Sequence, residues 1–269
     1  MNIVVCVKKI PDPEIPPAKF KLDVEAMRVI PPEGIPPVLS PYDAQAVELA
    51  IRLKEKNGGA ITVLSIDEEG SPKIVRHALS MGADEGIVLT DEAFCDADSF
   101  GTADILSRAI KKIGGFDLIL CGRQAADWDE GLVGSIIAEK LELPLVTLAE
   151  DIELMNDGEY AIKVRRVTLD GYQVFGVPCP AVVTVSNEVG APRLPSGWGI
   201  ISASKKDIPV WNAADIEMDT SKLGQKAFRR KLKKLFIPDR KRECEIIEAE
   251  TTAEAAVKLA ERLKDEGWV

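Results

Sequence analysis

The sequence is short of the residues on which most catalytic and metal sites depend. It has one histidine, His77, in 269 residues, and its five cysteines are scattered without a CxxC pair. A single histidine argues against a Ser-His-Asp or Cys-His triad, and the GxSxG motif is absent. Unpaired cysteines lack metal-ligand spacing. We therefore expect no catalytic residue, no metal site and no enzyme activity, with His77 on a helix surface and Cys6 and Cys121 as buried free thiols.

Long apolar runs and a positive net charge are also missing. No run approaches the roughly 20 apolar residues of a membrane helix. The opening MNIVVCVKKIPD enters a strand-like pattern without the regions of a signal peptide. The formal net charge of −10 argues against nucleic-acid binding. These absences favour a cytoplasmic protein that neither inserts into a membrane nor binds nucleic acid.

Regular alternation of strands and helices is present instead. Apolar strand patterns such as AITVLSI and FDLILC alternate with helical patterns such as DAQAVELAIRLKEK up to about residue 150. Strands that alternate with helices of ten or more residues indicate βαβ units. A final helix of this series is expected from Asp129 or Glu130 to Leu141. The sequence predicts a Rossmann-like, doubly wound, mostly parallel α/β sheet.

The pattern changes after residue 150. Three apolar-alternating segments follow in YAIKVRRVTLDGYQVFGVPCPAVVTVS, and Asp170-Gly171 is a hairpin signal. We interpret them as an antiparallel extension of the sheet. KFKLD and MRVI, within the proline-rich stretch 11–41, favour a short surface hairpin.

The C-terminal segment shows no core of its own after residue 205. Residues 222–242 carry ten basic residues and one acidic residue, and a helical pattern capped by Thr251 or Thr252 follows. Such a tail needs a surface to lie on, either its own domain or a partner. We favour a nucleotide-binding domain at 1–204 and an arm at 205–269 that docks on a partner subunit.

The loop in LILCGRQAADWDEGLVGSIIAEKL joins a strand to a helix. A helix N-terminus offers free N–H groups suited to phosphate, and Gly122, Gly131 and Gly134 allow close backbone approach. The GxGxxG and GxxxxGK[ST] signatures are absent, so an ordinary capped loop remains an alternative. Residues 6–8, 40–43 and 65–66 adjoin other strand ends, and we expect them to converge with 122–133 on one crevice for an adenine nucleotide.

Several stretches together resemble a known family. VCVKKIPD, SPYDAQAVELAIRLKEK, CGRQAADWDEGLVGSIIAEKLELP, VPCPAVVTVSNEV and APRLPSGWGIISASKK run almost end to end. Their order and spacing are similar to those of the electron transfer flavoprotein β subunit, including the nitrogen-fixation-associated and bifurcating relatives.

The resemblance implies a heterodimer with an α subunit that carries the redox-active FAD. The β subunit would hold a structural AMP, or a second FAD in bifurcating members. It would pass electrons from a flavin dehydrogenase or iron-sulfur oxidoreductase to a quinone reductase or other acceptor. The family's nucleotide site maps onto Cys6, Ser40, Pro41, Tyr42, Asp43, Ile66, Gly122, Arg123, Gln124, Ala125, Asp127, Asp129, Gly131 and Val133.

The sequence departs from the family at two places that bear on function. Glu130 replaces Thr or Cys and would bring a carboxylate close to the phosphate, unless it turns to solvent. Gly197 stands where the family's exposed docking leucine is expected, with Trp198 beside it, so we predict that Leu194 or Trp198 anchors the redox partner. A buried Trp198 is the alternative.

Two other functions remain open. A stress-protein-like adenine-nucleotide sensor on the same fold would be a homodimer. An ATP-using enzyme of this fold class would need an SGGxDS-like loop, which is absent.

Overall fold

The computed structural model describes residues 1–269 except 96, 156–160, 224–228, 239–243 and 269. It divides into two units, Met1–Lys233 and Lys234–Val269. The elements of the first unit are β1 (Asn2–Val7), β2 (Lys9–Ile10), β3 (Lys21–Asp23), β4 (Arg28–Ile30), β5 (Val38–Leu39), α1 (Pro41–Asn57), β6 (Ala60–Ile66), α2 (Lys73–Met81), β7 (Glu85–Leu89), α3 (Ser99–Ile113), β8 (Leu118–Gly122), α4 (Val133–Leu141), β9 (Leu145–Leu154), β10 (Ile162–Thr168), β11 (Gly171–Val177), β12 (Ala181–Val185), α5 (Gly197–Lys205) and β13 (Val210–Trp211).

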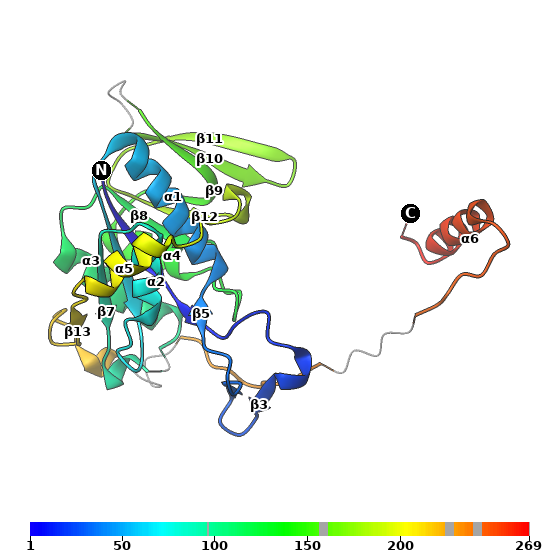
Figure 1. The fold of residues 1–269 in the computed structure, drawn as a ribbon, viewed down its shortest axis with the longest axis horizontal. Helices are drawn as coiled ribbons and strands as arrows, with labels where there is room; N and C mark the ends of the chain where they lie inside the picture. Colours follow the sequence, from blue (N-terminus) through cyan, green and yellow to red (C-terminus); the bar gives the residue numbers. More distant parts are fainter. Residues whose placement is uncertain (96, 156–160, 224–228, 239–243, 269) are drawn as a thin grey trace. The chain divides into compact units, whose positions relative to one another are not determined.

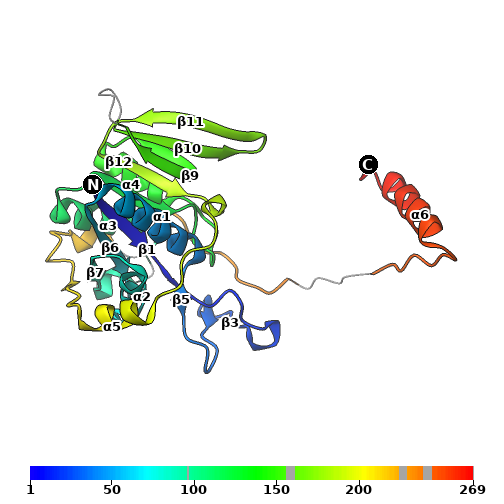
Figure 2. The ribbon, with the colours of Figure 1, turned by 45° about the horizontal axis from the view of Figure 1, so that its top comes forward.

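A large sheet with the order β11-β10-β9-β12-β8-β1-β6-β7-β13 forms the centre of the first unit. The strands from β9 through β12, β8, β1, β6 and β7 to β13 are parallel, whereas β10 and β11 are antiparallel additions. Figures 1 and 2 show the β10–β11 hairpin at one edge of this sheet. The predicted doubly wound α/β fold is confirmed.

Helices cover both faces of the sheet (Figures 1 and 2). In β1, Ile3 and Val5 join the core that contains α1 and α2, whereas Val4 and Cys6 join the core that contains α3 and α4. This division follows from the two-residue period of a strand. Both cores consist mainly of Val, Ile, Leu and Ala, as is typical of a parallel sheet that is buried on both faces.

The last segment of the predicted antiparallel extension lies elsewhere. Residues 181–185 form β12, which lies between β8 and β9 and is parallel to both. All five side chains are buried, so the strand is covered on both faces and does not alternate between core and solvent. The extension therefore consists of β10 and β11. The hairpin predicted from KFKLD and MRVI is confirmed as the pair β3–β4.

The division between the two units lies later than the boundary expected at residue 204. β13 pairs with β7, and Ala213, Ile216 and Met218 are buried in the core beside α3. A two-residue strand and irregularly spaced apolar residues give no periodic signal, which is why the sequence suggested no core there. The described part of the basic run spans both units, while its residues 224–228 and 239–242 lie outside the described residues.

The second unit contains the helix α6 (Thr252–Asp265). The Thr251 hydroxyl accepts a hydrogen bond from the Glu254 N–H at 3.2 Å, which confirms the predicted cap. None of its side chains is buried, and Val257, Leu259 and Leu263 are exposed. An amphipathic helix without a covered apolar face is expected to pack against another surface.

Candidate functional site

The strand order places a topological switch point at the carboxyl ends of β1 and β8. From β1 the chain moves to β6 and β7 on one side, and then α3 returns it to β8 on the other side of β1. Ligands of open α/β sheets bind at such a switch point. The residues that were predicted to converge lie at this point: residues 6–8 end β1, and residues 122–133 follow β8. Ile66 ends β6, the other neighbour of β1.

Asp43 joins three of the predicted segments. Its carboxylate accepts hydrogen bonds from the Lys8 N–H at 2.8 Å and from the Gly122 N–H at 3.1 Å. The stretch between β1 and α1 closes through the β2–β5 pair, and the Ser40 N–H donates to the Lys8 carbonyl at 3.0 Å. The start of α1 is thereby held against the ends of β1 and β8.

Burial raises the pKa of Asp43 to about 7, against the lowering effect of the Lys8 and Gly122 N–H groups and the Lys8 charge; Asp127 adds to the increase. An acid with a raised folded-state pKa takes up a proton more readily when folded than when unfolded. Asp43 therefore lowers the free energy of unfolding progressively as pH rises from about 4 to about 7, and the effect is constant above that pH.

A pH series of urea unfolding should show this effect of Asp43. Asn cannot ionise, so we expect the free energy of unfolding of Asp43→Asn to rise relative to that of the natural chain by about 3–4 kcal/mol between pH 4 and pH 7.5. Asp43→Asn also loses one hydrogen-bond acceptor, which changes its free energy of unfolding by the same amount at every pH. The pH dependence of the difference between the two proteins is therefore the informative quantity. A difference that does not change with pH would contradict the assignment.

The backbone of the loop after β8 is not helical. Asp129 and Gly131 have φ angles of 51° and 63°, which a right-handed helix excludes. For this reason α4 begins at Val133 and not at the expected Asp129 or Glu130. Lys8 Nζ pairs with Asp127 at 2.7 Å, and the Gln124 side-chain amide donates to Asp129 at 2.9 Å. These two contacts fix the conformation of the loop without a ligand.

Three features of the residues at this switch point fit an adenine nucleotide. Among the described residues, the buried Ser40 hydroxyl and the buried Arg123 Nε lack hydrogen-bond partners. The Arg123 guanidinium lies 5.9 Å from the centre of the Tyr42 ring. Leu132 at the N-cap of α4 provides no capping side chain, so the first amides of α4 remain open to an anion. Bound phosphate and ribose would supply acceptors and hydroxyls to these groups.

Glu130 does not turn toward the start of α4. Its carboxylate accepts a hydrogen bond from the Ser99 hydroxyl at the start of α3 and pairs with Arg230 Nη1 at 2.7 Å. The predicted conflict between Glu130 and a phosphate is therefore absent from this arrangement. Sequence reasoning missed Arg230 because nothing local links it to a residue a hundred positions away.

The buried thiols Cys6 and Cys121 lie next to each other on β1 and β8. A hydrogen bond with Cys6, burial and the negative charge of nearby groups raise the pKa of Cys121 well above its usual value. A raised pKa keeps the thiol protonated and unreactive, so Cys121 serves as an apolar wall under the loop. His77 is exposed on α2, as expected.

The predicted docking residues lie on an exposed surface. Leu194 is 89% exposed and Trp198 is 78% exposed, which excludes the alternative of a buried tryptophan. Trp198 lies in the first turn of α5, and Ser196 caps this helix by accepting a hydrogen bond from the Gly199 N–H at 3.0 Å. Figure 2 shows α5 beside α2. A hollow of about 350 Å³ is lined by Trp198, Ile201, Ser202, Lys205 and Lys206.

An ion-pair network fixes the segment that leads to α5. Arg193 Nε lies 2.8 Å from the Glu48 carboxylate, Arg193 Nη1 lies 2.5 Å from Glu55, and the Arg193 N–H also donates to Glu48. Burial opposes ionisation of Glu48, but the Arg193 and Arg52 hydrogen bonds outweigh it and hold the Glu48 pKa below its usual value. A bidentate arginine between two carboxylates is rigid, so Leu194 is presented from a fixed backbone.

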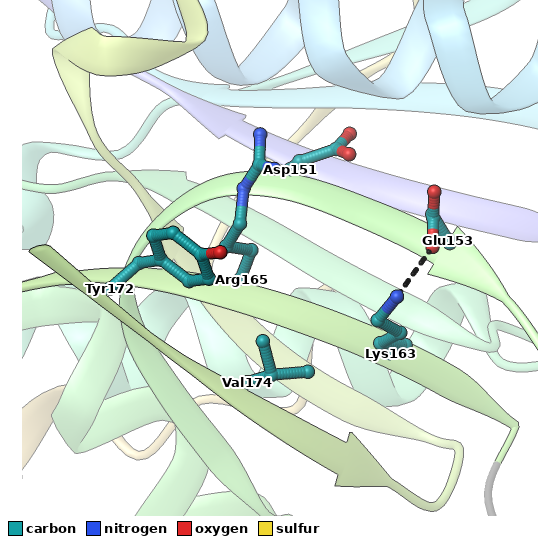
Figure 3. Close-up of a pocket in the computed structure, with 6 residues that line it drawn as sticks. All are labelled: Asp151, Glu153, Lys163, Arg165, Tyr172 and Val174. Carbon is teal, nitrogen blue, oxygen red and sulfur yellow. Dashed lines mark hydrogen bonds and ion pairs between the residues drawn. The ribbon is translucent and has the colours of Figure 1, made fainter.

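A further pocket of about 170 Å³ lies on the sheet extension, and its side chains are shown in Figure 3. Lys163 pairs with Glu153 at 3.1 Å, and Arg165 pairs with Glu150 at 2.5 Å while its guanidinium lies 5.5 Å from the Tyr172 ring centre. The basic groups are thus already paired across strands. This surface offers no excess positive charge for a nucleotide phosphate.

Metal sites and membrane-spanning helices are both absent from the part of the chain that the structure describes. No group of three or more His, Cys, Asp or Glu side chains there is arranged to hold a metal ion. Within the same residues, no helix combines the length and the apolar character that a bilayer crossing requires.

Comparison with known proteins identifies the family. Residues 29–216 match the electron transfer flavoprotein domain. The chain belongs to the electron transfer flavoprotein family. It is 39% identical to the electron transfer flavoprotein subunit beta of Thermoanaerobacterium thermosaccharolyticum, with 98% of each chain covered. Identity is 37% with the caffeyl-CoA reductase-Etf complex subunit CarD of Acetobacterium woodii, covering 98% of each chain. It is 30% with protein FixA of Azorhizobium caulinodans, covering 98% of this chain and 94% of the relative.

The predicted relationship to electron transfer flavoprotein β subunits is confirmed by these matches. They cover nearly the whole chain, so the relationship includes the C-terminal segment and not only the sheet. Family membership assigns the chain an electron transfer role in a flavin-associated complex.

Proposed function

We propose that this chain is the β subunit of a heterodimer whose α subunit carries the redox-active FAD. The pair accepts electrons from a flavin dehydrogenase or an iron-sulfur oxidoreductase and passes them to a quinone reductase or another acceptor. The family match along nearly the whole chain carries this proposal. The name of the Acetobacterium relative, a subunit of a reductase-Etf complex, supports a dehydrogenase as partner.

The chain itself would hold an AMP, with a second FAD as the alternative, in the crevice at the ends of β1 and β8. The α4 amides would bind phosphate, and the unpartnered Ser40 hydroxyl and Arg123 Nε would complete their hydrogen bonds on the nucleotide. AMP supplies no redox chemistry, whereas a second flavin supplies a second electron site. The side chains bind, orient and exclude water; none of them performs a bond-breaking step.

Leu194 and Trp198 would anchor the redox partner. Trp198 lines a hollow edged by Lys205, and Leu194 is exposed on the segment that precedes α5. These features suit a small interface with an acidic, apolar partner surface. The uncovered apolar side chains of α6 would dock on the α subunit.

Co-expression with a candidate α subunit tests the proposal. We expect a yellow heterodimer, and we expect acid extraction and chromatography to release one FAD together with one AMP, or a second FAD. A colourless homodimer that releases an adenine nucleotide would support the stress-protein-like sensor instead. A yellow pair with only one FAD and no other nucleotide would remove the nucleotide-holding role and leave electron transfer intact.

A further inference from the structure

The end of the first unit is attached to the nucleotide loop by a small cluster of contacts. The Arg229 and Arg230 N–H groups donate to Asp98 Oδ2 at 2.7 and 3.1 Å. Arg230 Nη1 pairs with Glu130 at 2.7 Å, and Ser99 donates to the same Glu130 carboxylate. We call Asp98, Ser99, Glu130 and Arg230 the tail latch. Arg230 lies four residues before the second unit begins.

The latch has a charge arrangement that explains its acidic residues. Asp98 caps α3 through the Phe100 and Gly101 N–H groups, at 3.1 and 2.9 Å, while its other oxygen binds the tail. A cation near a helix N-terminus is disfavoured by the helix dipole. The Arg230 guanidinium is placed there nonetheless, and the carboxylates of Glu130 and Asp98 offset that cost.

The amides at the start of α4 offer the Glu130 carboxylate an alternative set of hydrogen-bond donors. It lies three residues before Val133, the first residue of α4, and Gly131 between them has a φ of 63°. Uncapped helix amides attract any nearby carboxylate. Only Ser99 and Arg230 hold Glu130 away from them among its described contacts.

From these contacts we infer that the tail latch couples attachment of the chain from Arg229 onward, called the arm here, to nucleotide binding at the proposed site. With Arg230 in place, Glu130 is drawn toward α3 and the α4 amides are free for phosphate. Detachment of the arm breaks the ion pair between Arg230 and Glu130. The Glu130 carboxylate then competes with the phosphate for the α4 amides and repels it. Nucleotide binding and arm attachment therefore favour each other. The inference rests on the nucleotide site proposed above.

A double-mutant cycle on the full heterodimer, with AMP as the probe in equilibrium dialysis, tests the coupling. We expect Arg230→Ala to weaken AMP binding about tenfold, since a carboxylate near a phosphate at intermediate dielectric is strongly repulsive. Glu130→Gln alone should leave the affinity within about twofold, and the Glu130→Gln, Arg230→Ala pair should return to the Glu130→Gln value. If FAD is the resident nucleotide, the same cycle is measured with FAD.

Arg229→Ala is the matched control. It removes the same charge from the adjacent residue, whose guanidinium lies 4.7 Å from the Phe100 ring centre and not on Glu130. Its effect on AMP binding should stay below about twofold. Equal losses for Arg229→Ala and Arg230→Ala, or no recovery in the double variant, would overturn the inference, because either result means a direct or general charge effect.

Trypsin provides a readout that needs no nucleotide. Glu130→Ala leaves every lysine and arginine in place, so faster cleavage at 229–234 reports release of the tail. We expect an increase of about fivefold, and an unchanged rate would show that Glu130 does not hold the tail. A wild-type pair that binds neither AMP nor FAD would instead refute the proposed nucleotide site, and the coupling with it.

Discussion

We expect replacement of Gly122 by alanine to lower the free energy of unfolding by about 3 kcal/mol and to abolish the proposed nucleotide binding. A Cβ atom at this position would lie 2.4 Å from Asp43 Oδ1 and 2.8 Å from the backbone carbon of Tyr42. Tyr42 is in the first turn of α1, so the backbone cannot yield cheaply. The clash also breaks the hydrogen bond between the Gly122 N–H and Asp43. The midpoint temperature of thermal unfolding should fall by roughly 6–12 °C for a unit of this size.

Gly197→Ala is the matched control for Gly122→Ala. It adds the same methyl group at a position where nothing lies within 4 Å, in the first turn of α5. Alanine favours a helix over glycine, so its stability should be unchanged or slightly higher. If both variants melt at the temperature of the natural chain, β8 and α1 do not approach as closely as described.

We expect Trp198→Ala to slow electron exchange with the native donor by about thirtyfold at limiting donor concentration, without a change in stability or in the visible spectrum. An exposed indole beside a hollow is the kind of anchor that contributes 2 kcal/mol or more to a small interface, and each 1.4 kcal/mol corresponds to a factor of ten. Trp198 is 78% exposed, so its removal leaves no cavity in the fold. Stopped-flow flavin reduction measures the exchange.

Trp268→Ala provides the comparison for Trp198→Ala. It removes an indole that is 75% exposed in the second unit, and it should leave the exchange rate of the intact heterodimer within about twofold. Equal rates for the natural chain and Trp198→Ala would remove the docking role from α5. A loss that Leu194→Ala shows and Trp198→Ala does not would assign the anchor to Leu194.

The sheet and its helices were largely predictable because their signals are local. AITVLSI is β6 at its predicted bounds, DAQAVELAIRLKEK lies within α1, and α3 covers residues 99–113. Each of these segments carries its own periodicity and its own stop signal, such as Gly114 after α3. The residues of the crevice were also predictable as a group, since the carboxyl ends of parallel strands must lie at one edge of a sheet.

Other features depended on contacts between distant segments. α4 begins at Val133, later than predicted, because Asp129 and Gly131 adopt positive φ angles. The helical pattern of the sequence does not reveal these angles. α5 was missed because Gly197 and Gly199 obscure its helical character, although Ser196 is a recognisable cap. β13 exists only because β7 offers a free edge to two residues.

By itself, the sequence determined the family, the βαβ alternation and the set of strand ends that meet at the switch point. These properties reside in residue order and short-range periodicity. Tertiary structure alone decided where Glu130 points, which carboxylate joins β1, α1 and β8, and where the first unit ends. Each of these depends on pairing between residues tens to more than a hundred positions apart, as between Glu130 and Arg230 or Asp43 and Gly122. Such pairs are selected by the geometry of the packed sheet, for which the chain carries no local pattern.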